Sequence, residues 1–396
     1  MDSFRASAAT CLALLLVGCA SRVAYVRRPA AEADVVLHVP CQGPDCAGAP
    51  PAAEPPPPPQ IPPPRMLAAG MNHTCALVED GGVYCWGAND RGQLGEVAAD
   101  RAWIPGRVPG LPRMNGVWAG GDQTCARAEE DGRLWCWGDT GLPDEREGPF
   151  ATQLAYADVR QVSLGYRIGC MVDDGGHTFC WGNYAQPQGP RWRTPQRVAI
   201  DAPVAILSGM QRQCALTQSG EVHCWGRPMI RYGHERVGGP FYRVSGVEGA
   251  TLAAIPKGNQ DQLIVVDRRG RLFESQPGRR SRRSYGHTPP MALAPIEGVD
   301  DPAQLLAGAG FFCVRTGQGT VACWGSNQAG QLGDGSLAAR SRPTFLALAG
   351  VQEIALGENH ACARDAAQVW CWGSNSRGQV GLERTTRVPD PTPVPW

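Results

Sequence analysis

Short apolar or alternating runs, separated by glycine and aspartate, make up the chain from residue 66 to its end. In the first unit these runs are "LAAG", "CALV" and "GVYCWG", all within residues 67–87. Runs of this length predict strands, and the "EDG" between the second and third predicts a tight turn. No window has the apolar period of an amphipathic helix. The pattern therefore predicts an all-β fold.

The unit repeats along the chain. A glycine is followed five residues later by a cysteine at Gly70/Cys75, Gly120/Cys125, Gly165/Cys170, Gly209/Cys214, Gly308/Cys313 and Gly357/Cys362. A Cys-Trp-Gly triplet then begins at Cys85, Cys136, Cys180, Cys224, Cys323 and Cys371. The period of 44 to 51 residues is typical of propeller blades.

A seventh copy lies between Cys224 and Cys313. In "LIVVDRRGRLFESQ", Gly270 aligns with Gly81 of the first unit, which places Ile264 and Glu274 where the cysteines would stand. This copy keeps the strand pattern without the cysteines. The repeat therefore predicts a seven-bladed β-propeller over residues 66–396.

The paired cysteines have three possible roles: a metal site, a redox centre or a strand staple. In a hairpin with its turn at Asp80 and Gly81, Cys75 and Cys85 face each other at a separation that suits a disulfide. Zinc and redox pairs favour shorter spacings. The separation varies from nine to eleven residues, and the change falls in the turn. We therefore expect the disulfides Cys75-Cys85, Cys125-Cys136, Cys170-Cys180, Cys214-Cys224, Cys313-Cys323 and Cys362-Cys371.

The N-terminus carries an export pattern. A short apolar stretch ends in Leu16-Val17-Gly18-Cys19, which resembles the lipobox of bacterial lipoproteins. The resemblance implies that residues 1–18 are a signal peptide, cleaved before Cys19, whose sulfur then carries a diacylglyceryl group. An ordinary signal peptide cut nearby is the alternative. We expect a lipid-anchored protein of the bacterial cell envelope, and Ala20 after the lipidated cysteine indicates the outer membrane.

Residues 19–65 are rich in proline, with Pro55 to Pro59 consecutive. Such a stretch favours an extended polyproline II spacer, at ~3.1 Å per residue. Cys41 and Cys46 are expected to form a small local disulfide, with a zinc half-site as the alternative. The segment is predicted to be a tether between the lipid and the propeller.

Charge narrows the choice of partners. The formal net charge is zero, so no global field draws the protein to nucleic acid or to an anionic membrane. Arginines gather locally in the unit without cysteines, at Arg268, Arg269 and Arg271 in the hairpin turn and at Arg279, Arg280, Arg282 and Arg283 in the following loop. These are either a solvated segment or a candidate anion-binding patch. The turn and the loop are expected at opposite ends of the blade.

The motifs Gly-Met-Asn-His-Thr at 70–74, "NDRGQLG", "SNQAGQLGDGS" and "SNSRGQVG" resemble the repeat of the regulator of chromosome condensation family. The resemblance spans residues 66–396 and implies a seven-bladed propeller. The middle units lack Gly-Gln-Leu-Gly, so their loops are expected to diverge. The eponymous protein's nuclear GTPase partner does not suit an exported chain. Related bacterial propellers include an inhibitor that grips β-lactamases with its loops, which keeps protein binding open. We also expect residues 391–396 to supply a strand to the first blade.

Candidate chemistry is sparse. His73 and His360 occupy matching repeat positions and are read as structural. The tryptophans after each second cysteine are expected to pack between blades, with a carbohydrate-stacking row as the alternative. No nucleophile, phosphate-loop or metal motif occurs, so we expect no catalytic residue, cofactor or metal. The predicted function is a monomeric scaffold that binds an envelope protein or polysaccharide. The alternatives are a lyase or hydrolase with its site in the propeller channel, or a polysaccharide-binding protein.

Overall fold

A computed structural model describes residues 23–24, 37–38, 61–95, 99–142, 152–154, 158–182, 192–209, 212–226, 234–236, 242–244, 247–258, 262–276, 292–383 and 385–395. The chain divides into two compact units, Met1–Gln60 and Ile61–Trp396. In the first, β1 (Val23–Ala24) pairs with β2 (Leu37–His38). Cys19, Cys41 and Cys46 lie outside the described residues. Over the part of the chain just given, no helix is long and apolar enough to span a bilayer.

The second unit consists of seven antiparallel sheets, each formed by one continuous stretch of chain. The strands of sheets one to three are β3 (Pro64–Ala69), β4 (His73–Val78), β5 (Val83–Ala88) and β6 (Arg101–Arg107); β7 (Met114–Gly120), β8 (Gln123–Ala128), β9 (Leu134–Gly138) and β10 (Thr152–Leu154); and β11 (Val159–Leu164), β12 (Ile168–Asp173), β13 (His177–Gly182) and β14 (Trp192–Asp201).

Sheets four to seven complete the set. Their strands are β15 (Ala205–Ser208), β16 (Arg212–Leu216), β17 (Val222–Gly226), β18 (His234–Arg236) and β19 (Tyr242–Val244); β20 (Ala250–Ala254), β21 (Ile264–Asp267), β22 (Leu272–Gln276) and β23 (Ala292–Ile296); β24 (Pro302–Ala307), β25 (Phe311–Thr316), β26 (Val321–Gly325) and β27 (Arg340–Phe345); and β28 (Glu353–Leu356), β29 (His360–Arg364), β30 (Val369–Ser374) and β31 (Arg387–Pro393).

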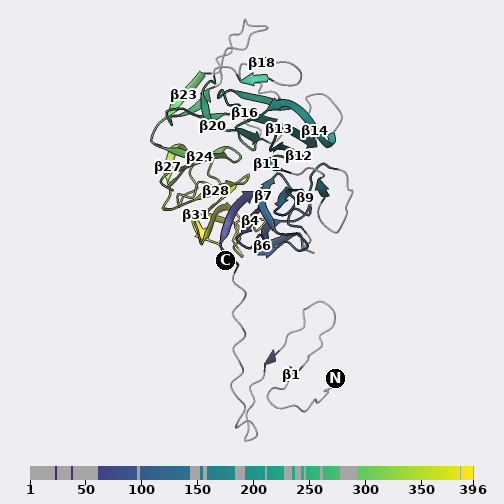
Figure 1. Cartoon of the computed structure of the whole chain (residues 1–396). Coiled ribbons are helices and arrows are strands. Elements are labelled where there is room, and N and C mark those ends of the chain that lie inside the picture. Colours follow the sequence, from purple (N-terminus) through teal and green to yellow (C-terminus); the bar gives the residue numbers. More distant parts are fainter. Residues whose placement is uncertain are drawn as a thin grey trace, which may run out of the picture. The chain divides into compact units, whose positions relative to one another are not determined.

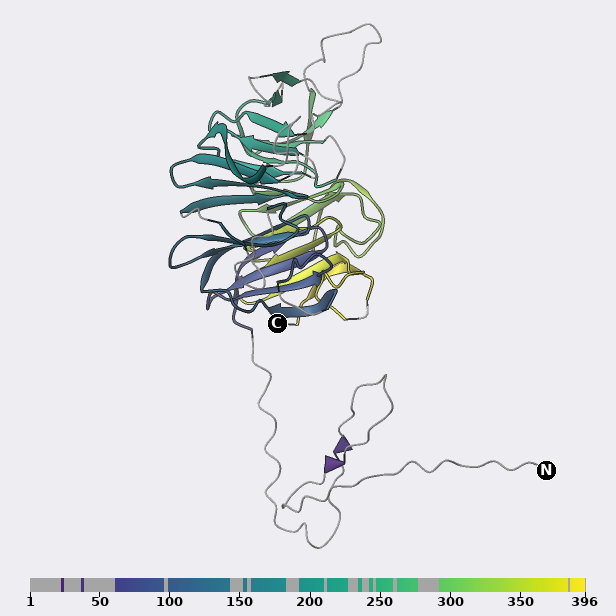
Figure 2. The same ribbon diagram turned by 90° about the vertical axis from the view of Figure 1, so that its right-hand side faces the viewer.

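The first strands of the sheets contact one another in succession and close a ring. Contacts run from β3 to β7, β11, β15, β20, β24 and β28, and β28 contacts β3 again. Figure 1 shows these strands around the middle of the second unit, and Figure 2 shows the same sheets from the side. The prediction of a seven-bladed β-propeller is confirmed.

Each stapled hairpin has the register that the cysteine spacing predicts. Cys75 lies directly opposite Cys85, and Gly81 adopts the positive φ of 79° that the turn requires. All six disulfides expected in the propeller are present, with Cα–Cα distances of 4.0 to 4.2 Å. In the fifth blade Ile264 lies directly opposite Glu274, so this hairpin keeps the register without a staple.

Seven apolar clusters fill the seven junctions between blades. Each tryptophan after a second cysteine is 0–4% exposed and packs against the preceding blade, at Trp86, Trp137, Trp181, Trp225, Trp324 and Trp372. The packing prediction is confirmed, and burial excludes a carbohydrate-stacking row. At the fourth junction Ser275 replaces the tryptophan, and its hydroxyl accepts a bond from the Leu263 N–H at 2.8 Å.

The expected role of residues 391–396 is wrong. The last strand, β31, pairs with β30 as the outer strand of the seventh blade, and the first blade builds all four of its strands from residues 64–107. The Pro-x-x-Val pattern therefore marks the outer strand of a blade, as Pro195 to Val198 do in β14, and not the start of the next blade. The ring therefore closes through contacts between the seventh and first blades, without strand exchange.

Candidate functional site

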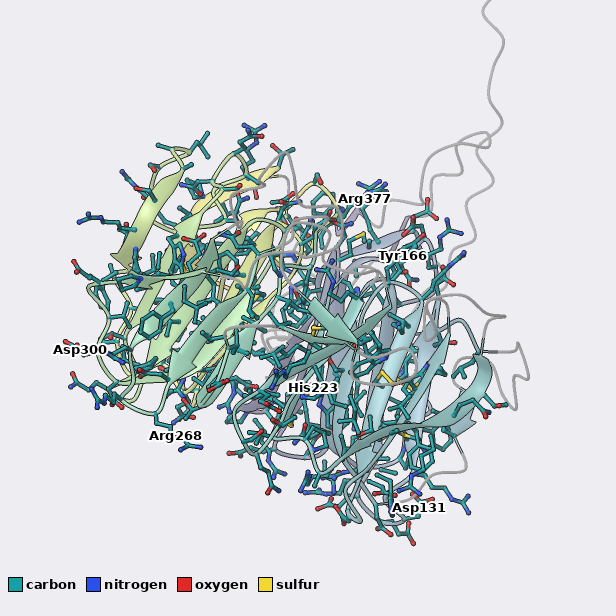
Figure 3. The ribbon with its side chains drawn as sticks, turned by 90° about the horizontal axis from the view of Figure 1, so that it is seen from above. Asp131, Tyr166, His223, Arg268, Asp300 and Arg377 are labelled. Carbon is teal, nitrogen blue, oxygen red and sulfur yellow. A yellow bond between two sulfur atoms is a disulfide. The ribbon has the colours of Figure 1, made fainter. Side chains whose placement is uncertain are left out.

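The topology gives the propeller two different faces. Connections between the first and second strands, and between the third and fourth, lie on one face, which we call the loop face. The hairpin turns between second and third strands lie on the other, the turn face. In Figure 3, Tyr166 and Arg377 of the loop face lie together, apart from Arg268 and Asp300 of the turn face.

Three connections on the loop face share one hydrogen-bond pattern. The Asn89 side-chain oxygen accepts from the Leu94 N–H at 2.9 Å, and the Gln93 side-chain oxygen accepts from the Arg91 N–H at 2.8 Å. The same bonds recur at Asn327/Leu332 and Gln331/Ala329, and at Asn375/Val380 and Gln379/Arg377. Buried amides thus fix each turn from within.

Each of these turns is also fixed to a neighbouring blade. The Gln93 carbonyl accepts from the Trp137 indole and the Thr124 hydroxyl, both at 2.9 Å. The Gln331 carbonyl accepts from the Trp372 indole at 3.0 Å. Because blades six, seven and one are consecutive in the ring, the turns form a continuous surface. We call its exposed side chains, at Asp90, Arg91, Gln328, Ser376 and Arg377, the loop arc.

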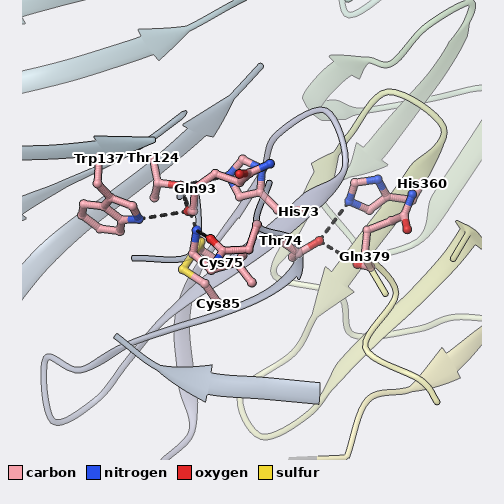
Figure 4. Close-up of a disulfide and its surroundings, with 11 residues drawn as sticks. His73, Thr74, Cys75, Cys85, Gln93, Thr124, Trp137, His360 and Gln379 are labelled. Carbon is pink, nitrogen blue, oxygen red and sulfur yellow. Dashed lines mark hydrogen bonds between the residues drawn. A yellow bond between two sulfur atoms is a disulfide. The ribbon is translucent and has the colours of Figure 1, made fainter. Parts of the chain in front are cut away.

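The two matching histidines lie beneath the loop arc and join blades. His73 Nε2 lies 2.9 Å from the Thr124 hydroxyl, and His360 Nε2 lies 2.9 Å from the Thr74 hydroxyl, which itself donates to the Gln379 carbonyl. Figure 4 shows these side chains at neighbouring junctions. Burial is the main cause and the Lys257 charge a smaller one, and together they lower the pKa of each imidazole to about 3. Both rings are therefore neutral, in keeping with a structural role.

The glycine of the Gly-x-x-His motif makes room for the imidazole. A Cβ atom on Gly357 would lie 2.0 Å from Cε1 of His360, whose position the Thr74 bond fixes. We expect Gly357→Ala to lower the free energy of unfolding by about 1–3 kcal/mol through overpacking. Gly106→Ala is the matched control, because its Cβ would meet only the Cys85 carbonyl oxygen, at 3.9 Å. Equal melting temperatures for the two variants would contradict this steric explanation.

A further set of polar contacts closes the ring between the seventh and first blades. Glu353 accepts from the Leu67 N–H at 3.1 Å and from Arg364 Nε at 2.8 Å. Burial raises the pKa of Glu353, and Arg364 opposes that rise. Gln304 makes the analogous contact between blades six and seven, bonding both the N–H and the carbonyl of Ile354 at 2.9 Å. These side chains satisfy backbone groups on strand edges that no neighbouring strand pairs.

The channel inside the ring is a cavity of about 280 Å³, lined by the first strands of all seven blades. Of the described residues that line it, Lys257 and Glu353 are the ionisable ones. Lys257 also lines a smaller hollow of about 20 Å³ toward the loop face, with Tyr166 and Glu358. Burial raises the pKa of Glu358, and burial with nearby Asp90 and Asp139 raises that of Asp122.

The arginine patch is only partly within the described residues. Arg268, Arg269 and Arg271 are exposed in the turn between β21 and β22, on the turn face, and Arg271 pairs with Asp267 at 2.6 Å. Arg279, Arg280, Arg282 and Arg283 lie outside the described residues. The anion-binding patch therefore stays a prediction.

The propeller can be compared with known proteins on two levels, its repeats and its fold. Family models described as "Regulator of chromosome condensation (RCC1) repeat" match residues 67–93 and 351–379, and residues 318–364. Residues 67–93 and 318–379 are thus similar to RCC1 repeats. These matches fall in blades one, six and seven, the blades that hold the loop arc. The segments that match the family models are thus the ones whose loops share the asparagine and glutamine hydrogen-bond pattern.

Two curated proteins match only part of the chain. The mitochondrial RCC1 domain-containing protein RUG3 of Arabidopsis thaliana is 32% identical over 92 residues, which is 21% of each chain. The human E3 ubiquitin-protein ligase HERC2 is 30% identical over 76 residues, 18% of this chain and 2% of its own. The matches thus span 21% of the length of RUG3 and 2% of the length of HERC2.

The fold has a solved counterpart. Prp20p of Saccharomyces cerevisiae superimposes with a TM-score of 0.67 at 18% identity, over 82% of this chain and 87% of its own. At that identity the likeness concerns the fold alone.

Two residues of the site were not predicted from the sequence, Lys257 and Glu353. The repeat pattern did predict the loops, the structural role of the histidines and the packing of the tryptophans. Lys257 stands in a connection three residues longer than in the first blade (256 to 264 against 70 to 75), which was the available signal.

Proposed function

We propose that this chain is a lipid-anchored, disulfide-stapled scaffold of the bacterial envelope that binds a protein partner through the loop arc. The observation that carries the proposal is that hydrogen bonds already hold the loop arc in one conformation in the unbound protein. Its turns are bonded internally by buried amides and fixed to neighbouring blades. A surface that is already ordered loses little conformational entropy on binding, so more of its contact energy becomes affinity.

The channel supports binding over catalysis. Lys257 and Glu353 are its ionisable lining residues within the described segments, and each already bonds protein atoms. General acid–base chemistry needs a group free to exchange a proton with a substrate. Prp20p has binding properties toward Gsp1p and histones, so a propeller of this fold can present a protein-binding face. We infer the same use here.

The loop arc carries both charge signs, at Asp90, Arg91 and Arg377, which favours a partner with a polar, mixed-charge surface. We expect the triple variant Asp90→Ala/Arg91→Ala/Arg377→Ala to reduce partner capture from envelope extracts at least tenfold. The control is Arg268→Ser/Arg269→Ser, which changes exposed charges on the turn face. Loss of capture in the control alone would show that the arginine turn is the binding site. Capture of a polysaccharide in place of a protein would show that the partner is a polysaccharide.

Anchoring has a separate test. We expect the wild-type chain to incorporate radiolabelled palmitate and to fractionate with the outer membrane, and Cys19→Ser to lose both properties. Cys11→Ser is the control, since that residue lies within the predicted signal peptide. Label retained by Cys19→Ser would contradict lipidation at this cysteine, and would leave the loop-arc proposal standing.

A further inference from the structure

Lys257 lies where the channel meets the loop face. It follows β20 in the fifth blade, yet its ammonium donates across the ring to the Ala69 carbonyl of the first blade at 2.8 Å. It also donates to the Leu356 carbonyl of the seventh blade. Lys257 lines both the 280 Å³ channel and the 20 Å³ hollow.

The ammonium has one donor beyond these two bonds. A lysine carries three N–H groups in a fixed tetrahedral arrangement, and the carbonyls of Ala69 and Leu356 use two. The neighbouring charge is Glu358, on the side of the smaller hollow. The carboxylate that lines the channel together with Lys257, among the described residues, is Glu353, which is bonded to Arg364 and to the Leu67 N–H.

The charge on Lys257 costs the fold stability. Burial lowers its pKa to about 8 from 10.5, and Glu358 only partly opposes that change. A lowered lysine pKa means that the charged form is disfavoured in the folded state, so the unfolded chain holds the proton more tightly. A residue retained at such a cost inside a cavity is a candidate for ligand binding.

The serine, glutamine and glutamate side chains that line the channel already have partners in the protein. Ser163 and Ser208 bond each other, and Ser208 donates to the Gln213 side chain at 2.7 Å. Gln304 bonds Ile354, and Glu353 is neutralised by Arg364. What remains is a wall made largely of Ala, Val, Leu and Ile side chains with one cation at its end.

We propose that the channel binds a small carboxylate with a short apolar body, whose carboxylate accepts the remaining N–H of Lys257. The volume limits the ligand. At ~30 Å³ for each water-sized group, 280 Å³ holds about nine non-hydrogen atoms. The apolar body is expected to lie among the side chains of β7, β11 and β24, and the charge to meet the ammonium, as in other small-molecule sites where a few polar groups fix orientation. This site is additional to the loop arc.

The test uses isothermal titration calorimetry on the full chain with hexanoate, which has about the size the channel allows, and with hexanamide, its uncharged counterpart. We expect saturable binding of hexanoate and at least tenfold weaker binding of hexanamide. Lys257→Met is expected to lose at least tenfold in hexanoate affinity while melting at the same or a higher temperature. Asp300→Asn, at an exposed position outside the channel and the loop arc, is expected to bind hexanoate as the wild-type chain does.

Three results would overturn the proposal: no saturable binding of hexanoate up to about 10 mM, equal affinity for hexanamide, or unchanged affinity in Lys257→Met. The hexanoate and hexanamide comparison in the wild-type chain decides the question even if Lys257→Met does not fold. None of these results bears on partner capture by the loop arc, so the two proposals fail separately.

Discussion

Replacing Cys170 and Cys180 together with alanine is expected to lower the free energy of unfolding by about 2.5 kcal/mol. The bond closes a loop of ten residues between directly opposed strand positions, and the chain-entropy relation gives that magnitude for such a loop. Equilibrium denaturation in guanidinium chloride measures it. Since both sulfurs are fully buried, reductant without denaturant is expected to leave the wild-type melting temperature unchanged.

The fifth blade offers the converse experiment. Ile264 and Glu274 lie directly opposite each other in the register that the cysteines occupy elsewhere. The double variant Ile264→Cys/Glu274→Cys is expected to form a seventh disulfide and to raise the free energy of unfolding by about 2–3 kcal/mol, less the loss of the Gln262–Glu274 bond. A free-thiol assay that finds both cysteines reduced would show that this hairpin does not have the common register.

Acidification from pH 8 to pH 5 is expected to destabilise the propeller by about 2 kcal/mol for each of His73 and His360. Their folded-state pKa of about 3 lies below the ordinary 6.5. The unfolded chain therefore binds more protons between these values. The stabilisation is fully present above pH 6.5 and is lost as the pH falls toward 3. Denaturation at a series of pH values gives the slope.

The second blade indicates which residue can replace the histidines in a control variant that does not titrate. Gln123 stands at the position of the histidines and donates to the Gly165 and Ile168 carbonyls, both at 2.9 Å. The double variant His73→Gln/His360→Gln is therefore expected to fold and to show a flatter pH dependence between pH 8 and pH 5. An unchanged slope in that variant would assign the acid sensitivity to other groups.

The fold was predictable because most blades repeat one local pattern, and the fifth and seventh each lack only part of it. A ten-residue cysteine spacing, a glycine in the turn and a tryptophan after the second cysteine each have a local physical reason, and all three held. Ring closure was mispredicted, because a Pro-x-x-Val run looks the same whether it ends one blade or begins the next. Only pairing of β31 with β30 distinguishes the two.

The contacts that define the site depend on proximity across the ring. Lys257 is 99 residues from Leu356, and Glu353 is 286 residues from Leu67. No local pattern marks such pairs, since a lone lysine or glutamate in a loop is ordinarily solvated. The sequence predicted the loop arc only in part. Its Gly-Gln motif is recognisable in the sequence, but the hydrogen bonds from the Trp137 and Trp372 indoles to the loops depend on how neighbouring blades pack.

Site-specific photocrosslinking in the host tests binding through the loop arc most directly. A photoreactive residue at position 377 lies on the arc, and one at position 268 lies in an exposed turn on the opposite face. We expect a discrete protein adduct from position 377, identified by mass spectrometry, and none from position 268. The same adducts from both positions, or an adduct from position 268 alone, would contradict a protein-binding role for the loop arc.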